Sequence, residues 1–218
     1  MIELRGVSLV FGRTRALHDV SVTIAPGITG LFGANGSGKS TLLRLLTGLL
    51  RPSAGEITIN GEPLDIRNEN FRSSVGYAGH EPGLYGDLTL RENLELFAKL
   101  YGVGESRVRT VIEEMELGDT AAAKVATLSA GTKRRVAVAR ALVHEPRLLF
   151  LDEPYANLDD EAADLVGAAI RRWFGPDRIA VVASHGAKRV KAYASAGVIL
   201  KRGRVATHGT YGERSEPA

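Results

Sequence analysis

Hydrophobic and polar residues alternate along much of the first sixty positions. The segment "IELRGVSLVF", which begins at Ile2, alternates with a period of two, and "DVSVTI" does so again. An apolar run, "ITGLF", lies between glycines, and "GEITING" ends in an Asn-Gly turn at Asn60–Gly61. We therefore predict strands throughout this region and expect several of them to pair antiparallel.

Helical spacing appears next to these strands and dominates the middle of the chain. Leucines three and four positions apart predict a helix over about 40–49, so the local order is strand, glycine-rich loop, helix. Apolar residues over about 90–117 form two helical stripes, which Gly102 and Gly104 separate into two helices. A third helix is predicted over about 132–143.

Strand signals return in the last third of the chain. The run "RLLFLDEP" is typical of a strand that is covered on both faces. An amphipathic helix near 160–174, a strand "RIAVVAS", a short helix after His185 and a hairpin "GVILKRGRVATHG" follow, and the tail "GERSEPA" is expected to fray. This order favours an α/β fold with a mainly parallel sheet, an antiparallel sheet near the N-terminus and a helical insertion.

Composition narrows the possible functions. With 218 residues, of which 44% are hydrophobic and 24% charged, the chain has the balance of a globular protein, and disorder or a fibre is excluded. The absence of cysteine excludes disulfides, thiol nucleophiles, thiolate zinc sites and iron–sulfur clusters. No apolar run approaches the ~20 residues that span a bilayer, and no signal peptide is expected. The net charge of +3 is spread evenly, so no nucleic-acid partner is expected.

A glycine-rich loop carries the strongest chemical signal. The segment "GANGSGKST" fits the pattern G-x-x-x-x-G-K-[ST] and lies between a predicted buried strand and a predicted helix. Glycines allow backbone N–H groups to approach phosphate oxygens, and the helix dipole adds positive potential. We predict that Lys39 binds the β- and γ-phosphates and that the Ser40 hydroxyl ligates Mg²⁺. The expected nucleotide-binding residues of this loop are Gly33, Asn35, Gly36, Ser37, Gly38, Lys39, Ser40 and Thr41.

Two adjacent carboxylates, Asp152 and Glu153, end the predicted strand "RLLFLDEP". Ligands of parallel sheets gather at the carboxyl ends of the strands. We predict that Asp152 holds Mg²⁺ through its water shell and that Glu153 acts as the base or polariser of a water in line with the γ-phosphate. The alternative is that both residues are solvated charges at a strand end, and the phosphate loop argues against it.

A third motif, "LSAGTKRRVAVARAL", precedes the acidic strand by about the length of one helix. It resembles the signature segment of ABC-type ATPases, whose commonest form is L-S-G-G-Q. Leu128, Ser129 and Gly131 match that form, whereas Ala130 and Thr132 depart from it. The resemblance implies a head-to-tail dimer, in which the signature of one subunit closes over the γ-phosphate of the ATP bound to the other.

The resemblance also implies a fold and a division of the chain. It implies the ABC ATPase fold, a P-loop NTPase core of mainly parallel sheet with an antiparallel β subdomain and a helical subdomain. We expect a single domain, with a core over 1–81 and 129–210, a helical subdomain over 82–128 and a tail over 211–218.

Three more segments follow in the family's order. "NLDD" resembles the D-loop, with Asp159 at the matching position, and "VVASH" resembles the switch-histidine segment. The resemblance implies that His185 senses the γ-phosphate and orients the attacking water. It places Phe11 where the family has an aromatic residue that stacks on adenine, although a Phe that closes a strand also suits a core position.

One position departs from the family. His80 stands where most members carry a glutamine that contacts Mg²⁺ and links the site to the membrane partner. Whether a histidine, whose charge changes near neutral pH, contacts the metal stays open. The segment "GHEPGLY" and the motifs around it are similar to the ATP-binding subunits of haem exporters in cytochrome c maturation. The ATPases of drug, lipid and polysaccharide exporters share much of this pattern.

The resemblance implies the following cofactors and partners. ATP and Mg²⁺ are the expected ligands, and a separate integral membrane permease is the expected partner, docked on the helical insertion near "EPGLYGDLT". The subunits are expected to form a homodimer or a heterodimer at the cytoplasmic face of the inner membrane, as a peripheral component.

Two other classes of function fit the sequence less well. Relatives that act on nucleic acid carry either a long coiled coil or two cassettes, and this sequence has one phosphate loop and no sustained heptads. A nucleotide-binding regulator without turnover would need neither Glu153 nor His185.

Overall fold

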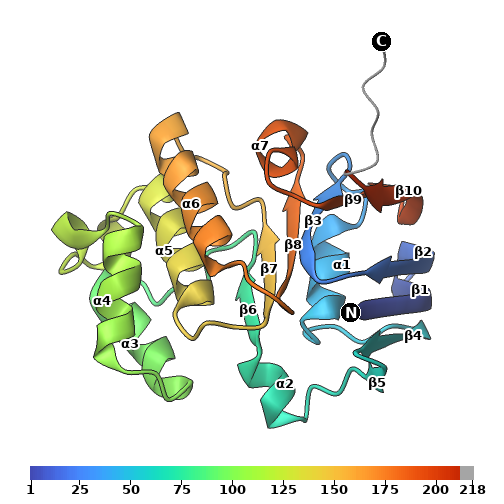
Figure 1. Ribbon diagram of the computed structural model, residues 1–218, viewed down its shortest axis with the longest axis horizontal. Coiled ribbons are helices and arrows are strands. Elements are labelled where there is room, and N and C mark those ends of the chain that lie inside the picture. The colour runs from blue at the N-terminus through green and yellow to red at the C-terminus, as the bar shows by residue number, and fades with distance from the viewer. Residues whose placement is uncertain (212–218) are drawn as a thin grey trace.

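The computed structural model describes residues 1–211, which form two sheets and the helices around them (Figure 1). A four-stranded sheet has the order β2-β1-β4-β5 and is antiparallel, as predicted for the N-terminal strands. Its strands are β1 (Ile2–Phe11), β2 (Thr14–Ile24), β4 (Ala54–Ile59) and β5 (Glu62–Pro63).

The second sheet has six strands in the order β10-β9-β3-β8-β7-β6. All neighbours pair in parallel except β10, which is antiparallel to β9. Every residue of β3, β7 and β8 is buried, which explains why these strands appear in the sequence as continuous apolar runs. The strands are β3 (Gly27–Phe32), β6 (Val75–Ala78), β7 (Leu148–Asp152), β8 (Ile179–Ser184), β9 (Ala196–Lys201) and β10 (Arg204–Thr210).

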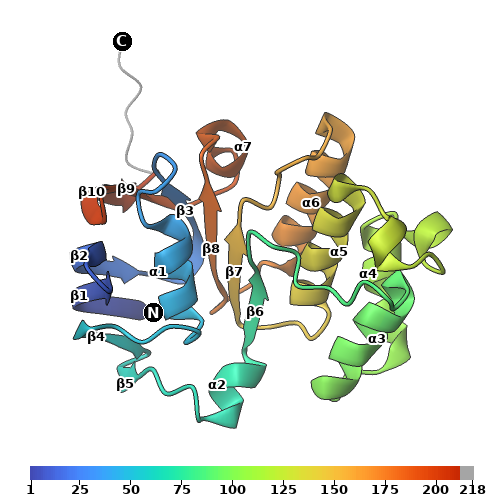
Figure 2. The same ribbon diagram turned by 180° about the vertical axis from the view of Figure 1, so that it is seen from behind.

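Helices cover both faces of the six-stranded sheet. One face carries α1 and the antiparallel sheet, and the other carries α5 and α6, with α3 and α4 on the far side of α5 (Figures 1 and 2). The helices are α1 (Lys39–Leu46), α2 (Glu69–Ser73), α3 (Leu90–Leu100), α4 (Glu105–Glu114), α5 (Ala130–Leu142), α6 (Asp160–Trp173) and α7 (Ala187–Lys191), with 3₁₀ turns at Gly118–Thr120 and Val125–Thr127.

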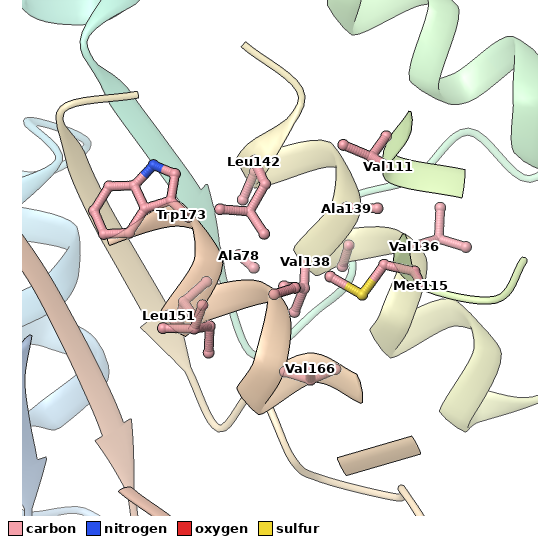
Figure 3. Close-up of a cluster of buried hydrophobic side chains, with 14 of the residues drawn as sticks. Ala78, Val111, Met115, Val136, Val138, Ala139, Leu142, Leu151, Val166 and Trp173 are labelled. Carbon is pink, nitrogen blue, oxygen red and sulfur yellow. The ribbon is translucent and has the colours of Figure 1, made fainter. Parts of the chain in front are cut away.

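Two hydrophobic cores result, one on each face of the sheet. Alternate residues of β7 enter different cores: Leu149 and Leu151 face the helical side, whereas Leu148 and Phe150 face α1. On the helical side, side chains from α4, α5 and α6 interlock (Figure 3). Trp173 closes that core and its indole N–H donates to the carbonyl of Pro146 at 2.9 Å. The strands that carry the predicted site are therefore packed on both faces.

Some predicted elements differ from those observed. The helix predicted over about 40–49 ends at Leu46, because the amide groups of Gly48 and Leu50 turn back to preceding carbonyls. The helix predicted over about 132–143 begins at Ala130, because Ser129 caps it. The short elements β6 and α2 were not predicted. The "GERSEPA" tail, predicted to fray, lies outside the described residues.

Among residues 1–211, no helix is both long enough and apolar enough to span a bilayer.

Candidate active site

The phosphate loop joins β3 to α1 at the carboxyl end of the sheet. Gly38 precedes α1 with φ of 107°, a conformation that L side chains rarely adopt, and a Cβ there would lie 2.8 Å from Leu17 Cδ2. No side chain caps α1. Because the first amides of a helix have no partner within it, those of α1 are available to an anion such as a phosphate.

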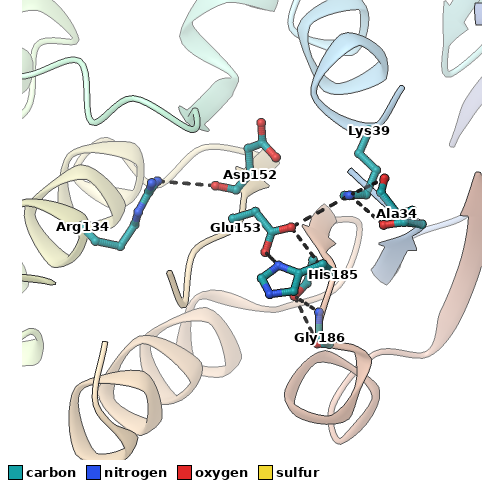
Figure 4. Close-up of polar contacts among 9 residues, drawn as sticks. Ala34, Lys39, Arg134, Asp152, Glu153, His185 and Gly186 are labelled. Atoms are coloured by element: carbon teal, nitrogen blue, oxygen red, sulfur yellow. Dashed lines mark hydrogen bonds and ion pairs between the residues drawn. The ribbon is translucent and has the colours of Figure 1, made fainter. Parts of the chain in front are cut away.

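Lys39 is the first residue of α1, and its side chain folds back over the loop (Figure 4). The ammonium donates to the carbonyl of Gly33 at 2.8 Å and to that of Ala34 at 3.3 Å, and only 7% of the residue is exposed. It also lies 4.0 Å from Glu153 Oε1. The charge of Lys39 is therefore fixed in place beside the glycine-rich loop.

Asp152 is the last residue of β7 and is 1% exposed. Its Oδ2 is buried and has no hydrogen-bond partner. A buried carboxylate oxygen without a partner is costly, and a hydrated cation would remove that cost. The residue thus fits the role of a Mg²⁺ ligand acting through water, with the Ser40 hydroxyl as a second oxygen donor at the same cavity.

Glu153 follows Asp152 with φ of 51°, unusual for a residue with a side chain. Its amide donates to the carbonyl of Ala183 at 2.9 Å, which holds this turn against β8. The carboxylate accepts the backbone N–H of His185 at 2.8 Å, and its other oxygen lies 2.9 Å from His185 Nδ1. Glu153 therefore lies between a lysine and a histidine, with one contact to Lys39 and two to His185 (Figure 4).

These side chains surround one cavity of about 740 Å³, within the usual size of ligand sites. A cavity of about 820 Å³ lies at the opposite, amino end of β7 and β8 and contains none of the predicted site residues. The smaller cavity contains the predicted residues Asn35, Gly36, Gly38, Lys39, Ser40, Thr41, His80, Asp152, Glu153 and His185.

Comparison with known proteins identifies the family to which the chain belongs. The family model described as "ABC transporter" matches residues 17–156, more than half of the chain. The chain belongs to the ABC transporter family. The match spans both the phosphate loop and the acidic pair of this ABC ATPase.

Named relatives match most of the ABC ATPase. It is 35% identical over 214 residues to the Nod factor export ATP-binding protein I of Rhizobium sp. (strain N33), covering 96% of this chain and 70% of the relative. It is 32% identical over 213 residues to the ABC transporter ATP-binding protein NatA of Bacillus subtilis (strain 168), covering 93% of this chain and 87% of the relative.

Solved structures agree with the fold. A dimeric ATP-binding cassette in a post-hydrolysis state, bound to ADP and Pi, superposes with a TM-score of 0.87 at 27% identity, covering 96% of this chain and 98% of the other. An ATP-binding subunit of an ABC transporter superposes with a TM-score of 0.86 at 30% identity, covering 97% and 90%. The predicted fold class is confirmed, and the protein is an ATPase.

The predicted signature residues lie away from the cavity of their own chain. Ser129 Oγ accepts the amide of Thr132 at 3.1 Å and so caps α5. A Cβ on Gly131 would lie 2.7 Å from the carbonyl of Asn157, so the signature packs closely on the loop after Glu153. Neither these residues nor Leu128 and Ala130 line the cavity.

Four other predicted residues also lie outside the cavity lining: Gly33, Ser37, Asp159 and Phe11. Asp159 caps α6, since its carboxylate accepts the amide of Ala162 at 2.8 Å. Phe11 ends β1, is 47% exposed and pairs with Thr14 across the hairpin. Thr14 lines the cavity and Phe11 does not.

Several lining residues were missed by sequence reasoning. Arg15, Ala16 and His18 come from β2, and Arg202 and Gly203 come from the turn between β9 and β10. This turn supports the phosphate loop directly. The Gly203 amide donates to the carbonyl of Ser37 at 2.9 Å, and its carbonyl accepts the amide of His18 at 2.8 Å. The hairpin was predicted, but no sequence signal placed its turn at the loop.

Proposed function

We propose that this ABC ATPase is the hydrolytic subunit of a multi-chain exporter, in which two cassettes close on ATP and drive a separate membrane permease. The observation that carries the proposal is the row Lys39, Glu153 and His185 along one cavity, beside the unpartnered carboxylate oxygen of Asp152. A pure nucleotide binder would need the lysine but not the carboxylate and histidine pair.

In the proposed reaction the residues divide the work. The loop amides and Lys39 bind the phosphates and neutralise their charge. Ser40 and Asp152 would hold Mg²⁺, which supplies further charge neutralisation when bound. Glu153 accepts a hydrogen bond from the attacking water, whose oxygen forms a bond to the γ-phosphorus while the bond to the bridging oxygen breaks. ADP and phosphate leave, and the water proton passes to Glu153 or to the phosphate.

His185 orients Glu153 in this scheme. It holds one carboxylate oxygen through its backbone amide and faces the other with its ring. With the proton on Nδ1, the ring would donate to the carboxylate and fix its direction. His80 lines the same cavity.

The dimer is proposed from the position of the signature. Ser129 and Gly131 begin a helix outside the cavity of their own chain, which suits a role toward the nucleotide of a second copy. The cassette cited above with ADP and Pi is dimeric. Because one chain carries both halves of such a composite site, a homodimer is sufficient and a heterodimer is an alternative.

The cargo and the location are also proposals. A relative cited above is named for Nod factor export, which supports an exporter. We propose that the subunit binds its permease at the cytoplasmic face of the inner membrane, through the segment around Tyr85. Haem as cargo rests on the sequence resemblance of "GHEPGLY" and the motifs around it, and the relatives cited above carry other names.

Substitution of Glu153 by Gln tests the hydrolytic and dimeric parts together. Closure needs ATP while reopening needs hydrolysis, so the variant should collect as an ATP-bound dimer and release no phosphate. Light scattering with Mg-ATP and a phosphate-release assay measure both. The exposed Glu113→Gln on α4 is the matched control. Normal turnover in the Glu153 variant would disprove the assignment, and a monomer with ATP would disprove the dimer.

Affinity purification from detergent-solubilised membranes tests the partner. Co-purification of integral membrane chains supports the transport role, and a Soret band in the visible spectrum would support haem as cargo. Membrane chains without haem would retain the transporter and reject that cargo. Recovery of nucleic acid in place of a membrane chain would overturn the proposal.

A further inference from the structure

A buried arginine links three segments next to the site. Arg134 lies on α5, a little more than one turn after its start, and is 4% exposed. Its guanidinium donates to the carbonyls of Gly79 at 2.7 Å, His80 at 2.5 Å and Asp152 at 3.4 Å. One side chain of the signature helix therefore contacts both the His80 segment and the end of β7.

The guanidinium of Arg134 forms no ion pair with the described residues. Within residues 1–211 no carboxylate lies within salt-bridge distance of it, so carbonyl dipoles solvate the cation, while Nε has no hydrogen-bond partner. Burial lowers the pKa of Arg134, and the nearby charges of Asp152 and Glu153 act in the opposite direction. The arginine thus places positive charge behind the two carboxylates of the site without neutralising either.

The geometry requires a guanidinium. Its planar fork presents several N–H groups at fixed angles and can donate to separate carbonyls at once. A lysine ammonium at this position would keep the charge but lacks the planar fork that reaches the separate carbonyls. Geometry and charge can therefore be separated by two different substitutions.

We propose that Arg134 is a positioning residue for ATP hydrolysis, which fixes the His80 segment to the strand end that carries Asp152 and Glu153. The inference rests on the proposed roles of those two carboxylates. A displacement of the His80 segment is then transmitted to the hydrolytic carboxylates through one side chain, and loss of that side chain uncouples them while nucleotide binding at the phosphate loop persists.

Arg140 supplies a matched comparison on the same helix. Its guanidinium donates to the carbonyls of Tyr77, at 2.9 Å, and Gly83, and it lies over the ring of Phe97 at 4.8 Å from the centroid. It therefore holds the same chain segment as Arg134. It makes no hydrogen bond to the end of β7, so it should contribute to stability without positioning the carboxylates.

The test compares Arg134→Lys and Arg134→Met with Arg140→Lys and Arg140→Met in the full chain. Turnover is measured with its KM for ATP, ATP affinity is measured by calorimetry, and hydrogen exchange is followed over residues 79–85 of the nucleotide-free protein. For Arg134→Lys we expect kcat to fall about tenfold with ATP affinity within about twofold, because an interaction used in the transition state is lost while ground-state binding remains. Arg134→Met should lose more, since it also removes the charge.

Hydrogen exchange of backbone amides measures the effect of each substitution independently of ATPase activity. In both Arg134 variants the amides near His80 should exchange faster, since two carbonyl anchors of that segment are gone. The Arg140 variants should show faster exchange nearer Gly83 and a similar drop in thermal stability, yet keep kcat within about twofold of the wild type.

Equal loss of kcat in Arg134→Lys and Arg140→Lys would overturn the inference, as would a loss that lies wholly in ATP affinity. If Arg134→Met fails to fold, the lysine variant decides, because it keeps the charge and most of the volume. Glu153→Gln in the same assay separates the two proposals. Full ATP turnover in Glu153→Gln would reject the proposed function. Loss of turnover in Glu153→Gln together with normal turnover in Arg134→Lys would reject only the role of Arg134.

Discussion

The starts of α1 and α5 are two solutions to the same problem. Each helix begins at a predicted phosphate contact. Neither has an acidic residue in its first turn, where a negative charge would interact favourably with the helix dipole. Before α1 stands Gly38 with φ of 107° and no side-chain cap. Before α5 stands Ser129 with φ of −61°, whose hydroxyl accepts the amide of Thr132.

The difference teaches how the two ends are stabilised. The start of α5 has a cap from its own chain, because the Ser129 hydroxyl accepts the amide of Thr132. The start of α1 lacks such a cap, its lysine is held by loop carbonyls, and its amides are free to bind an anion. We therefore expect changes at α1 to act on nucleotide affinity and changes at α5 to act on stability and on assembly.

The largest effect is expected for Lys39→Ala. Loss of an ammonium that faces the β- and γ-phosphates should weaken ATP binding by about a hundredfold. Calorimetric titration measures it, with Ser129→Ala as the control that should bind ATP normally as a monomer. Unchanged affinity in the lysine variant would contradict the assignment of the α1 site.

The next effect is expected for Gly38→Ala. The added Cβ would combine an unfavourable φ with a contact of 2.8 Å to Leu17, so ATP affinity should fall by about tenfold or more. Gly102→Ala is the control, because Gly102 also has a positive φ, of 68°, but no atom within 4 Å of the added Cβ. Equal ATP affinity in both variants would show that the loop tolerates the change.

A smaller effect is expected for Ser129→Ala. Loss of the cap should lower the free energy of unfolding by about 1 kcal/mol and should also weaken ATP-driven dimerisation. Thr89→Ala removes the capping box of α3 and serves as control, since it should lose comparable stability and keep dimerisation. Denaturant unfolding and light scattering measure the two quantities. Normal dimerisation in Ser129→Ala would remove the serine from the interface.

The smallest effect is expected for Ala130→Gly, which gives the third position of the signature its commonest residue and leaves Thr132 unchanged. Added backbone freedom should cost about 0.5 kcal/mol in unfolding free energy. Steady-state turnover should stay within about twofold of the wild type, because Ser129 and Gly131 are unchanged. A large gain in turnover would show that the alanine restricts the approach of a second cassette.

The features that the sequence predicted are those set by residues close together in the chain. The segments at Gly33–Thr41 and Asp152–Glu153 are contiguous, and buried parallel strands appear as apolar runs. The strand β6 was not predicted, because its four residues are too few to show an alternation of apolar and polar positions. The contact of Gly203 with the phosphate loop joins distant parts of the chain. Arg134 and Arg135 are adjacent in a basic run, and only tertiary packing decides that the first is buried.

The strand order has a consequence for folding during synthesis of the chain. In the six-stranded sheet β8 lies between β3 and β7, although it is the last of the three to be synthesised. Until Ile179–Ser184 have left the ribosome, the strands that precede the phosphate loop and the acidic pair lack the strand that joins them. The site therefore cannot be completed in the early nascent chain, and β3 and β7, whose residues are all buried in the finished fold, stay exposed to aggregation until their central partner is made.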